Sequence, residues 1–171
     1  HVLLMSSVPV LGPRLSLVER FLRWLPGLQR YEDDLRDQWQ SRKHREEWRR
    51  LLSLLEHVRC GAGHHVTVVS GEIHMATRAT MICKDGAVVN QLVASGIAHP
   101  AQPQLFAYAL GALAHIGEAP LPGRPVRLHP LPGTRQIYTV NRNYLCLSRD
   151  EGNWQAVWER EHLGPTPPLS L

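Results

Sequence analysis

The chain has 171 residues, of which 43% are hydrophobic and 20% are charged, a balance typical of one globular domain with a sizeable core. The formal net charge of +4 comes from 19 Lys+Arg against 15 Asp+Glu, and the arginines are spread among acidic residues, so no nucleic-acid-binding stripe is expected. No apolar run approaches the ~20 residues that a membrane-spanning helix requires, and no signal peptide is recognisable, so no membrane partner is expected.

The three cysteines, Cys60, Cys83 and Cys146, are odd in number and widely spaced, with no C-x-x-C motif. This pattern argues against a disulfide framework and against a structural zinc site. Their apolar or helix-end contexts are typical of structural rather than nucleophilic thiols. A reducing compartment, and with it the cytoplasm, is the default expectation.

The N-terminal part of the chain predicts one strand and one helix. Residues 2–10 form an apolar run that predicts a buried strand, ended by Gly12-Pro13. Ser16 and Glu19 have the spacing of a capping box, and apolar residues follow at helical intervals until Pro26-Gly27. Because the chain enters an apolar strand at its first residues, we expect it to be the C-terminal piece of a longer protein.

The next part predicts a second helix and a second buried strand. Residues 28–40 are polar and acidic, and we expect a loop there. Over 42–58, apolar residues recur at i, i+3, i+4 and i+7 while charges fill the other face, which is the pattern of an amphipathic helix. The β-branched run at 65–70 then predicts a strand buried on both faces. A strand, a helix and a strand in this order suggest a βαβ-type layer.

The remainder of the chain alternates short strands with one helix. Strands are predicted at 79–83 and 87–93, joined by the hairpin signal Asp85-Gly86, and a helix is predicted over 104–116. Five prolines between 117 and 134 predict a long irregular loop. Further strands are predicted at 135–140, 143–148 and 154–160, with a turn at 150–153. The Pro-rich tail, residues 163–171, is expected to be disordered.

The most informative segment is Val66–His74, in which an apolar run ends at Gly71 and an acid and an imidazole follow two residues apart. In open α/β sheets, the chemistry collects beyond the carboxyl ends of the strands. Residues i and i+2 of an extended segment point to the same side, so Glu72 and His74 could converge on one metal ion. The alternative is a polar turn in which His74 is only hydrogen-bonded in place.

Three further residues are candidates for the same site. Asp37 lies in the acidic loop and could support a metal ligand or belong to a surface ion pair. Trp39 is an aromatic residue in a polar loop and is expected to pack against another part of the chain. His99 precedes Pro100 at another predicted strand end and could line the same cleft or be structural. The sequence contains no Gly-x-Ser-x-Gly elbow and no phosphate-binding P-loop.

Five segments occur in an order that is typical of one protein family. They are the apolar strand and Ser-Pro-type loop of Leu3–Pro9, the Asp-x-Trp segment Asp37–Trp39 with the charged helix after it, Val69–His74 with its Gly-Asp-Val-His-like end, Gln91–Ile97 and Arg142–Leu145. In these segments the chain resembles the C-terminal half of PhoD-like phosphatases (alkaline phosphatase D type), a branch of the calcineurin-like metallophosphatase superfamily. The resemblance extends over nearly the whole chain up to about residue 160.

The resemblance implies an α/β fold over residues 1–162, the C-terminal part of an α/β/β/α sandwich with mixed sheets and flanking helices. It also implies that His74, together with Glu72 in the place of the family's Asp, binds a dinuclear centre of divalent or mixed-valence metal ions. The longer Glu side chain moves the carboxylate by about one methylene, which can shift the metal preference. Asp37 and Trp39 would support these ligands, and His99 would contact the phosphoryl group or the leaving oxygen.

For the parent protein, the resemblance implies an enzyme that hydrolyses a phosphate mono- or diester substrate. The family's other ligands come from its N-terminal half, so the partner of this piece would be the N-terminal half of the same domain. A dinuclear site needs roughly six or more protein ligands, and we therefore expect residues 1–171 alone to be inactive. One alternative is a non-catalytic metallophosphatase-like binding or scaffolding domain. Another is an unrelated β-rich domain.

Overall fold

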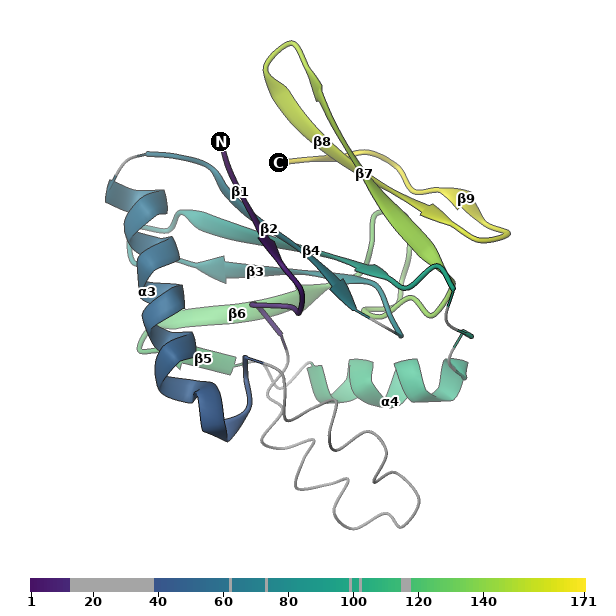
Figure 1. The fold of residues 1–171 in the computed structure, drawn as a ribbon, viewed down its shortest axis with the longest axis horizontal. Helices are drawn as coiled ribbons and strands as arrows, with labels where there is room; N and C mark the ends of the chain where they lie inside the picture. Colours follow the sequence, from purple (N-terminus) through teal and green to yellow (C-terminus); the bar gives the residue numbers. More distant parts are fainter. Residues whose placement is uncertain (13–38, 62, 73, 99, 102, 115–117) are drawn as a thin grey trace.

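The computed structural model describes residues 1–12, 39–61, 63–72, 74–98, 100–101, 103–114 and 118–171 (Figure 1). The helical elements of these residues are the short 3-10 helix η1 (Arg42–His44) and the α-helices α3 (Arg45–Gly61) and α4 (Gln104–Ala114). The described strands are β1 (Val2–Ser6), β2 (Val66–Glu72), β3 (Thr77–Ile82), β4 (Val88–Ser95), β5 (Glu118–Leu121), β6 (Arg124–His129), β7 (Asn143–Asp150), β8 (Asn153–Arg160), β9 (Gly164–Pro165) and β10 (Leu169–Ser170). The chain is thus a mixed α/β structure, as the sequence predicts.

The larger sheet has six strands in the order β1-β2-β4-β3-β6-β5. Strands β1, β2 and β4 run parallel to one another, and the remaining neighbours pair antiparallel. The predicted hairpin between β3 and β4 is confirmed, with the Cys83 N–H donating to the Ala87 carbonyl at 2.8 Å and Gly86 at φ +83°. A positive φ of this kind suits glycine, which has no Cβ to clash. The helix predicted over 104–116 corresponds to α4.

Helix α3 covers one face of the larger sheet (Figure 1). Its apolar stripe is buried through Trp48, Leu52 and Leu55, which confirms the amphipathic pattern predicted for 42–58. These side chains form the main core together with Val10, Leu11, Val66, Val68, Ala79, Met81, Cys83, Val89 and Val126. The Trp48 indole N–H also donates to the Val10 carbonyl at 2.8 Å. The helix is therefore fixed by burial and by a buried hydrogen bond.

The smaller sheet is a β7–β8 hairpin extended by β10 and β9, both of which pair with β8. The predicted turn at 150–153 is confirmed, with Glu151 at φ +44° and Gly152 at φ +90°. This sheet packs through Trp158 and Ala156 against Leu92 of β4. Leu92 is not part of the core cluster under α3, to which β4 contributes Val89. Because neighbouring strand residues alternate in direction, α3 and the smaller sheet cover opposite faces of β4.

Two predictions for the region after α4 are wrong. Residues 117–134 were expected to be an irregular loop because of their prolines, but β5 and β6 form a hairpin there with Gly123 at φ +73°. β5 is an edge strand, and its pairing with β6 shifts register between Glu118 and Leu121, so Pro120 removes no regular ladder bond. Conversely, no strand forms at 135–140, where only Thr139 makes a bridge, to Ala76. The apolar residues Ile137 and Tyr138 instead join the cluster under α4.

The expectation of a disordered tail at 163–171 also differs from the structure. The tail returns along β8 as β9 and β10. Thr166 is only 3% exposed, and its hydroxyl accepts a hydrogen bond from the Trp158 backbone N–H at 3.1 Å. Leu169 and Leu171 pack against the cluster around Trp158. The prolines do not oppose this arrangement, because an edge of a sheet tolerates residues without an N–H. None of the described helices combines the length and apolar character needed to cross a bilayer.

His129 at the end of β6 makes stability depend on pH. Burial, reinforced by the charges of Arg78 and Arg127, lowers its pKa below the ordinary value of 6.5. The unfolded chain therefore binds a proton at a pH where the folded chain still holds this ring neutral, so the stabilisation is complete above pH 6.5 and is lost as the pH falls towards the lowered pKa.

We expect the urea midpoint of the wild-type chain to drop between about pH 7.5 and about pH 5, and to drop less in His129→Gln. The amide of the variant can still meet the Thr80 hydroxyl, which lies 2.8 Å from His129 Nε2. Equal drops in the two proteins would show that His129 does not carry this dependence.

Candidate metal centre at the strand ends

The carboxyl ends of β1, β2 and β4 meet at one edge of the larger sheet. The parallel register sets Ser6 beside Ser70, and Glu72 beside Ser95. β2 is the middle strand of the three, so the segment after it is flanked on both sides. The end of β2 therefore has the position at which α/β sheets place their functional residues.

The loop after β1 is held against this edge by a buried side chain, Gln91 of β4. Its Oε1 atom accepts hydrogen bonds from the backbone N–H groups of Val10 at 2.9 Å and Leu11 at 3.2 Å. Its Nε2 group donates to the Ser70 hydroxyl at 2.9 Å. Gln91 is fully buried, so these bonds replace the water that its amide loses on folding. The sequence offered one signal for this residue, a polar side chain inside the apolar run of β4.

A second polar network borders the other side of the edge. Asn143, 2% exposed at the start of β7, accepts from the Ser95 backbone N–H at 3.2 Å and donates to the Ser95 hydroxyl at 2.7 Å. The same amide donates to the Asn141 carbonyl at 2.7 Å. This network ties the end of β4 to the smaller sheet. Sequence reasoning placed Asn143 in a strand but did not find its role, because its partner lies far away along the chain.

The arginine next to this network, Arg142, forms an ion pair. Arg142 precedes Asn143 and pairs with Glu161 through two hydrogen bonds, one of them 2.7 Å from Nε to Oε2. The hydrogen bond from Arg142 lowers the pKa of the Glu161 carboxyl. The positive charge of Arg142 is therefore balanced at the beginning of β7.

The structure places only part of the predicted site. Glu72 is the last residue of β2, and His74 lies in a half-buried bend two residues later. Trp39 lies in a turn and packs against the main core, which confirms that it packs, although a role towards a metal stays a prediction. Asp37 and His99 lie outside the described residues.

The donor set at this edge suits a hard or borderline metal ion but is small. Glu72 offers a carboxylate and His74 an imidazole, which are ligand types of Zn²⁺, Fe and Mn²⁺ sites. Among the described side chains, three ligand atoms gather only at Glu56, Cys60 and Cys83, and this cluster lies at the other end of β3 and β4. Glu72 and His74 are only two ligands, fewer than a metal centre requires, so the strand-end site would depend on further ligands.

Comparisons with known proteins provide one distant relative. No family model matches the chain, and no solved structure matches it. A yeast protein, "Uncharacterized protein YGR266W" from Saccharomyces cerevisiae, is 27% identical over a segment that covers 45% of this chain. The matching segment spans 14% of the length of that yeast protein.

Proposed function

We propose that this chain provides one side of a metal centre that hydrolyses phosphate mono- or diesters, within a PhoD-like metallophosphatase domain. The observation that carries the proposal is the position of Gly71-Glu72-x-His74 at the end of the middle one of three parallel strands. The layer order of α3, larger sheet and smaller sheet is compatible with three layers of an α/β/β/α sandwich. The resemblance of the ordered sequence segments adds to this support.

The proposal assigns each residue a part. The Glu72 carboxylate and the His74 imidazole hold metal, and His99 contacts the phosphoryl group or the leaving oxygen. When bound, a pair of metal ions lowers the pKa of a coordinated water and neutralises charge on the phosphoryl oxygens. Gln91 and Asn143 fix the two flanks of the edge through the hydrogen bonds described above.

The remaining ligands are proposed to come from the N-terminal half of the same domain. A dinuclear centre requires roughly six or more protein ligands, which is more than the strand ends of this chain offer. Among the described residues, β1 pairs with β2 alone, and Met5 of β1 is 85% exposed. An unpaired strand edge with an exposed apolar side chain is suited to receive further structure.

One observation favours a second candidate, a non-catalytic binding or scaffolding domain of the same superfamily. Glu72 stands where the resembled family has Asp, so the fold could persist without its metal.

Metal analysis of the full-length protein separates the two candidates. The enzyme hypothesis predicts about two metal ions at the strand ends of each chain. In His74→Ala it predicts loss of this metal together with a roughly 10²-fold or larger fall in phosphate-ester hydrolysis. His64→Ala is the matched control, because His64 is exposed and precedes the opposite end of β2. The chain of residues 1–171 alone is measured in parallel and is expected to be inactive.

Two results would contradict the enzyme hypothesis or the ligand count. Equal metal content in wild type and His74→Ala would exclude His74 as a ligand and favour the non-catalytic domain. Clear phosphatase activity of the purified 171-residue chain would show that this chain contains a complete site.

A further inference from the structure

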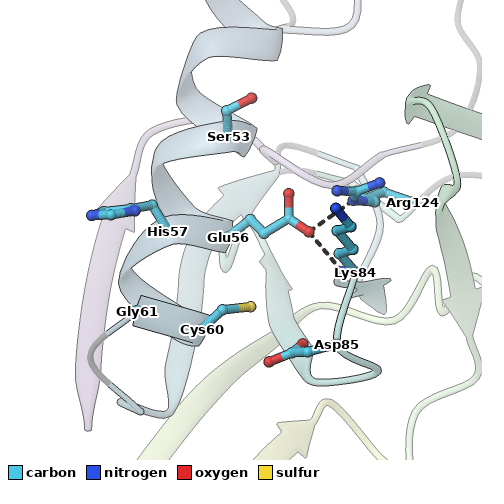
Figure 2. A pocket seen from close by; sticks show the side chains of 8 residues that line it. All are labelled: Ser53, Glu56, His57, Cys60, Gly61, Lys84, Asp85 and Arg124. Carbon is cyan, nitrogen blue, oxygen red and sulfur yellow. Dashed lines mark hydrogen bonds and ion pairs between the residues drawn. The ribbon is translucent and has the colours of Figure 1, made fainter.

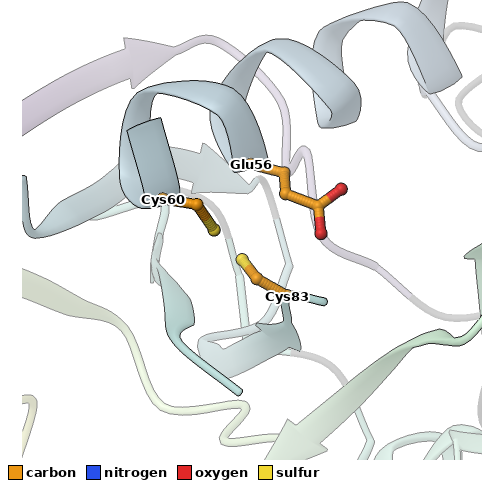
Figure 3. Close-up of side chains that lie close together, drawn as sticks. All are labelled: Glu56, Cys60 and Cys83. Carbon is orange, nitrogen blue, oxygen red and sulfur yellow. The ribbon is translucent and has the colours of Figure 1, made fainter. Parts of the chain in front are cut away.

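A cluster of two thiols and a carboxylate lies at the opposite edge of the larger sheet from the proposed phosphatase centre. Glu56 and Cys60 come from the last turns of α3, and Cys83 directly follows β3 (Figure 3). One carboxylate oxygen of Glu56 and the two sulfur atoms all lie within 4.8 Å of one another. Figure 3 shows the two sulfur atoms directed towards each other.

The surrounding structure fixes this arrangement. Glu56 and Cys60 are four residues apart on α3, so their side chains share one face of the helix. Glu56 Oε1 accepts hydrogen bonds from the Lys84 backbone N–H at 2.7 Å and from Arg124 Nε at 2.8 Å (Figure 2). Metal-binding carboxylates commonly accept hydrogen bonds of this kind, which orient them for the metal. The contact with Arg124 is therefore compatible with ligation by Glu56.

The cluster can be reached from solvent. Cys60 is half-buried and Cys83 is buried. Cys60 lines a surface pocket together with Glu56, Lys84, Asp85 and Arg124 (Figure 2), and the Cys83 sulfur lies within 4.8 Å of the Cys60 sulfur. An ion can therefore enter beside Cys60, while Cys83 closes the inner side.

The carboxylates beside the thiols favour a bound cation. One carboxylate oxygen of Glu56 lies within 4.8 Å of both sulfur atoms, and Asp85 lines the same pocket. A divalent cation is the largest charge in such a site and deprotonates its thiols.

We propose that Cys60, Cys83 and Glu56 bind a divalent ion of the zinc class, with Asp85, which lines the same pocket, as the candidate for the fourth ligand. Two thiolates and carboxylate oxygens match the tetrahedral sulfur and oxygen ligation that Zn²⁺ accepts. Ligand atoms around a tetrahedral zinc ion lie about 3.5–4 Å apart, so movements of about 1 Å complete the site.

Binding exchanges two thiol protons for one Zn²⁺ and transfers no electrons. The ion would clamp the end of α3 to the β3–β4 hairpin, and with Asp85 as its fourth ligand it would be structural rather than catalytic. This site is independent of the proposed phosphatase centre, because the two lie at opposite ends of β4.

The test is a metal titration of the reduced, purified 171-residue chain. Co²⁺ is added as a spectroscopic probe and then displaced by Zn²⁺ in competition with a chromophoric chelator. We expect a thiolate-to-cobalt charge-transfer band, one Zn²⁺ bound per chain and release of two protons. Cys60→Ser should abolish the band or weaken it strongly, and should lower zinc affinity by about tenfold or more.

Three further variants make the result specific. Cys146→Ser is the matched control, because Cys146 is exposed on β7, and it should leave the band and the affinity unchanged. Glu56→Gln keeps an oxygen acceptor for Arg124 and should keep the thiolate band while weakening zinc binding. His74→Ala should leave the band intact, which separates this site from the proposed phosphatase centre.

The proposal is overturned if the reduced chain shows no thiolate band, or if Cys60→Ser binds as tightly as Cys146→Ser while its circular dichroism spectrum is that of the wild type. If Cys60→Ser fails to fold, Glu56→Gln decides, and unchanged zinc affinity in that variant rejects the site. Isolation of a Cys60–Cys83 disulfide, combined with absence of zinc binding after reduction, would identify the pair as redox-active thiols and would likewise overturn the proposal.

Discussion

Trp158→Ala is expected to lower the free energy of unfolding by about 3–5 kcal/mol, the largest effect predicted for this chain. Trp158 is fully buried and packs with Leu92, Leu131 and Ala156 between the two sheets. Its indole N–H donates to the Val93 carbonyl at 3.0 Å, so the substitution leaves both a cavity and a backbone acceptor without its partner. Urea denaturation followed by circular dichroism measures the loss.

Two other variants divide this effect into its parts. Trp158→Phe keeps most of the packing and removes the hydrogen bond, so it should lower the free energy of unfolding by only about 1–2 kcal/mol. Tyr144→Ala, on the neighbouring strand β7 and 51% exposed, should change it by about 1 kcal/mol or less. If Trp158→Ala were no more harmful than Tyr144→Ala, the two sheets would not depend on this residue.

Gln91→Leu is expected to lower the free energy of unfolding by about 2–4 kcal/mol. The substitution nearly conserves volume, so packing is largely retained. However, it removes the acceptor of the Val10 and Leu11 N–H groups and the donor to the Ser70 hydroxyl, all in the buried interior. A buried N–H without an acceptor retains its full desolvation penalty. Chemical denaturation again measures the effect.

The same variant also probes the proposed phosphatase centre. Gln91 holds the loop after β1 beside the end of β2, so Gln91→Leu should reduce metal content in the full-length protein under conditions in which it remains folded. Gln104→Leu, at the exposed start of α4, is the matched control and should change stability by within about 0.5 kcal/mol. Equal stability of the two variants would show that the Gln91 hydrogen bonds are replaced by other contacts.

The two proposed metal sites would stabilise different parts of the larger sheet. Glu72 and His74 lie at the carboxyl end of β2, whereas Cys60 and Cys83 lie beside the start of β4. Their chemistries also differ, because carboxylate and imidazole ligands suit hard or borderline ions while thiolates select softer ones. Loss of one metal should therefore leave the other bound, and the variants described above can test each site separately.

The sequence alone predicted the elements whose burial repeats with a regular period. The apolar stripe of α3 and the β-branched run of β2 were identified in this way, and the turns at Asp85-Gly86 and Gly152 predicted two hairpins. The sequence also predicted that Glu72 and His74 follow a strand end, because the end of an apolar run is visible locally.

Other features depended on contacts between distant segments. Because of their prolines, the β5–β6 region and the tail were both predicted to be irregular. In the structure, both segments form strands at the edge of a sheet, where a residue without an N–H is tolerated. The structural role of Gln91 could not be predicted from the sequence, because it depends on two backbone N–H groups of the distant loop after β1.

The cysteines illustrate the same limit. Their wide spacing argued against a metal site, because local ligand motifs are the only ones that spacing can reveal. The packing of α3 against the β3–β4 hairpin then brought Cys60, Cys83 and Glu56 together. The sequence by itself determined the local elements, because the periodic spacing of apolar residues along a helix or strand can be seen among neighbouring residues. Only the tertiary structure decided which distant side chains meet, because that depends on how whole elements pack.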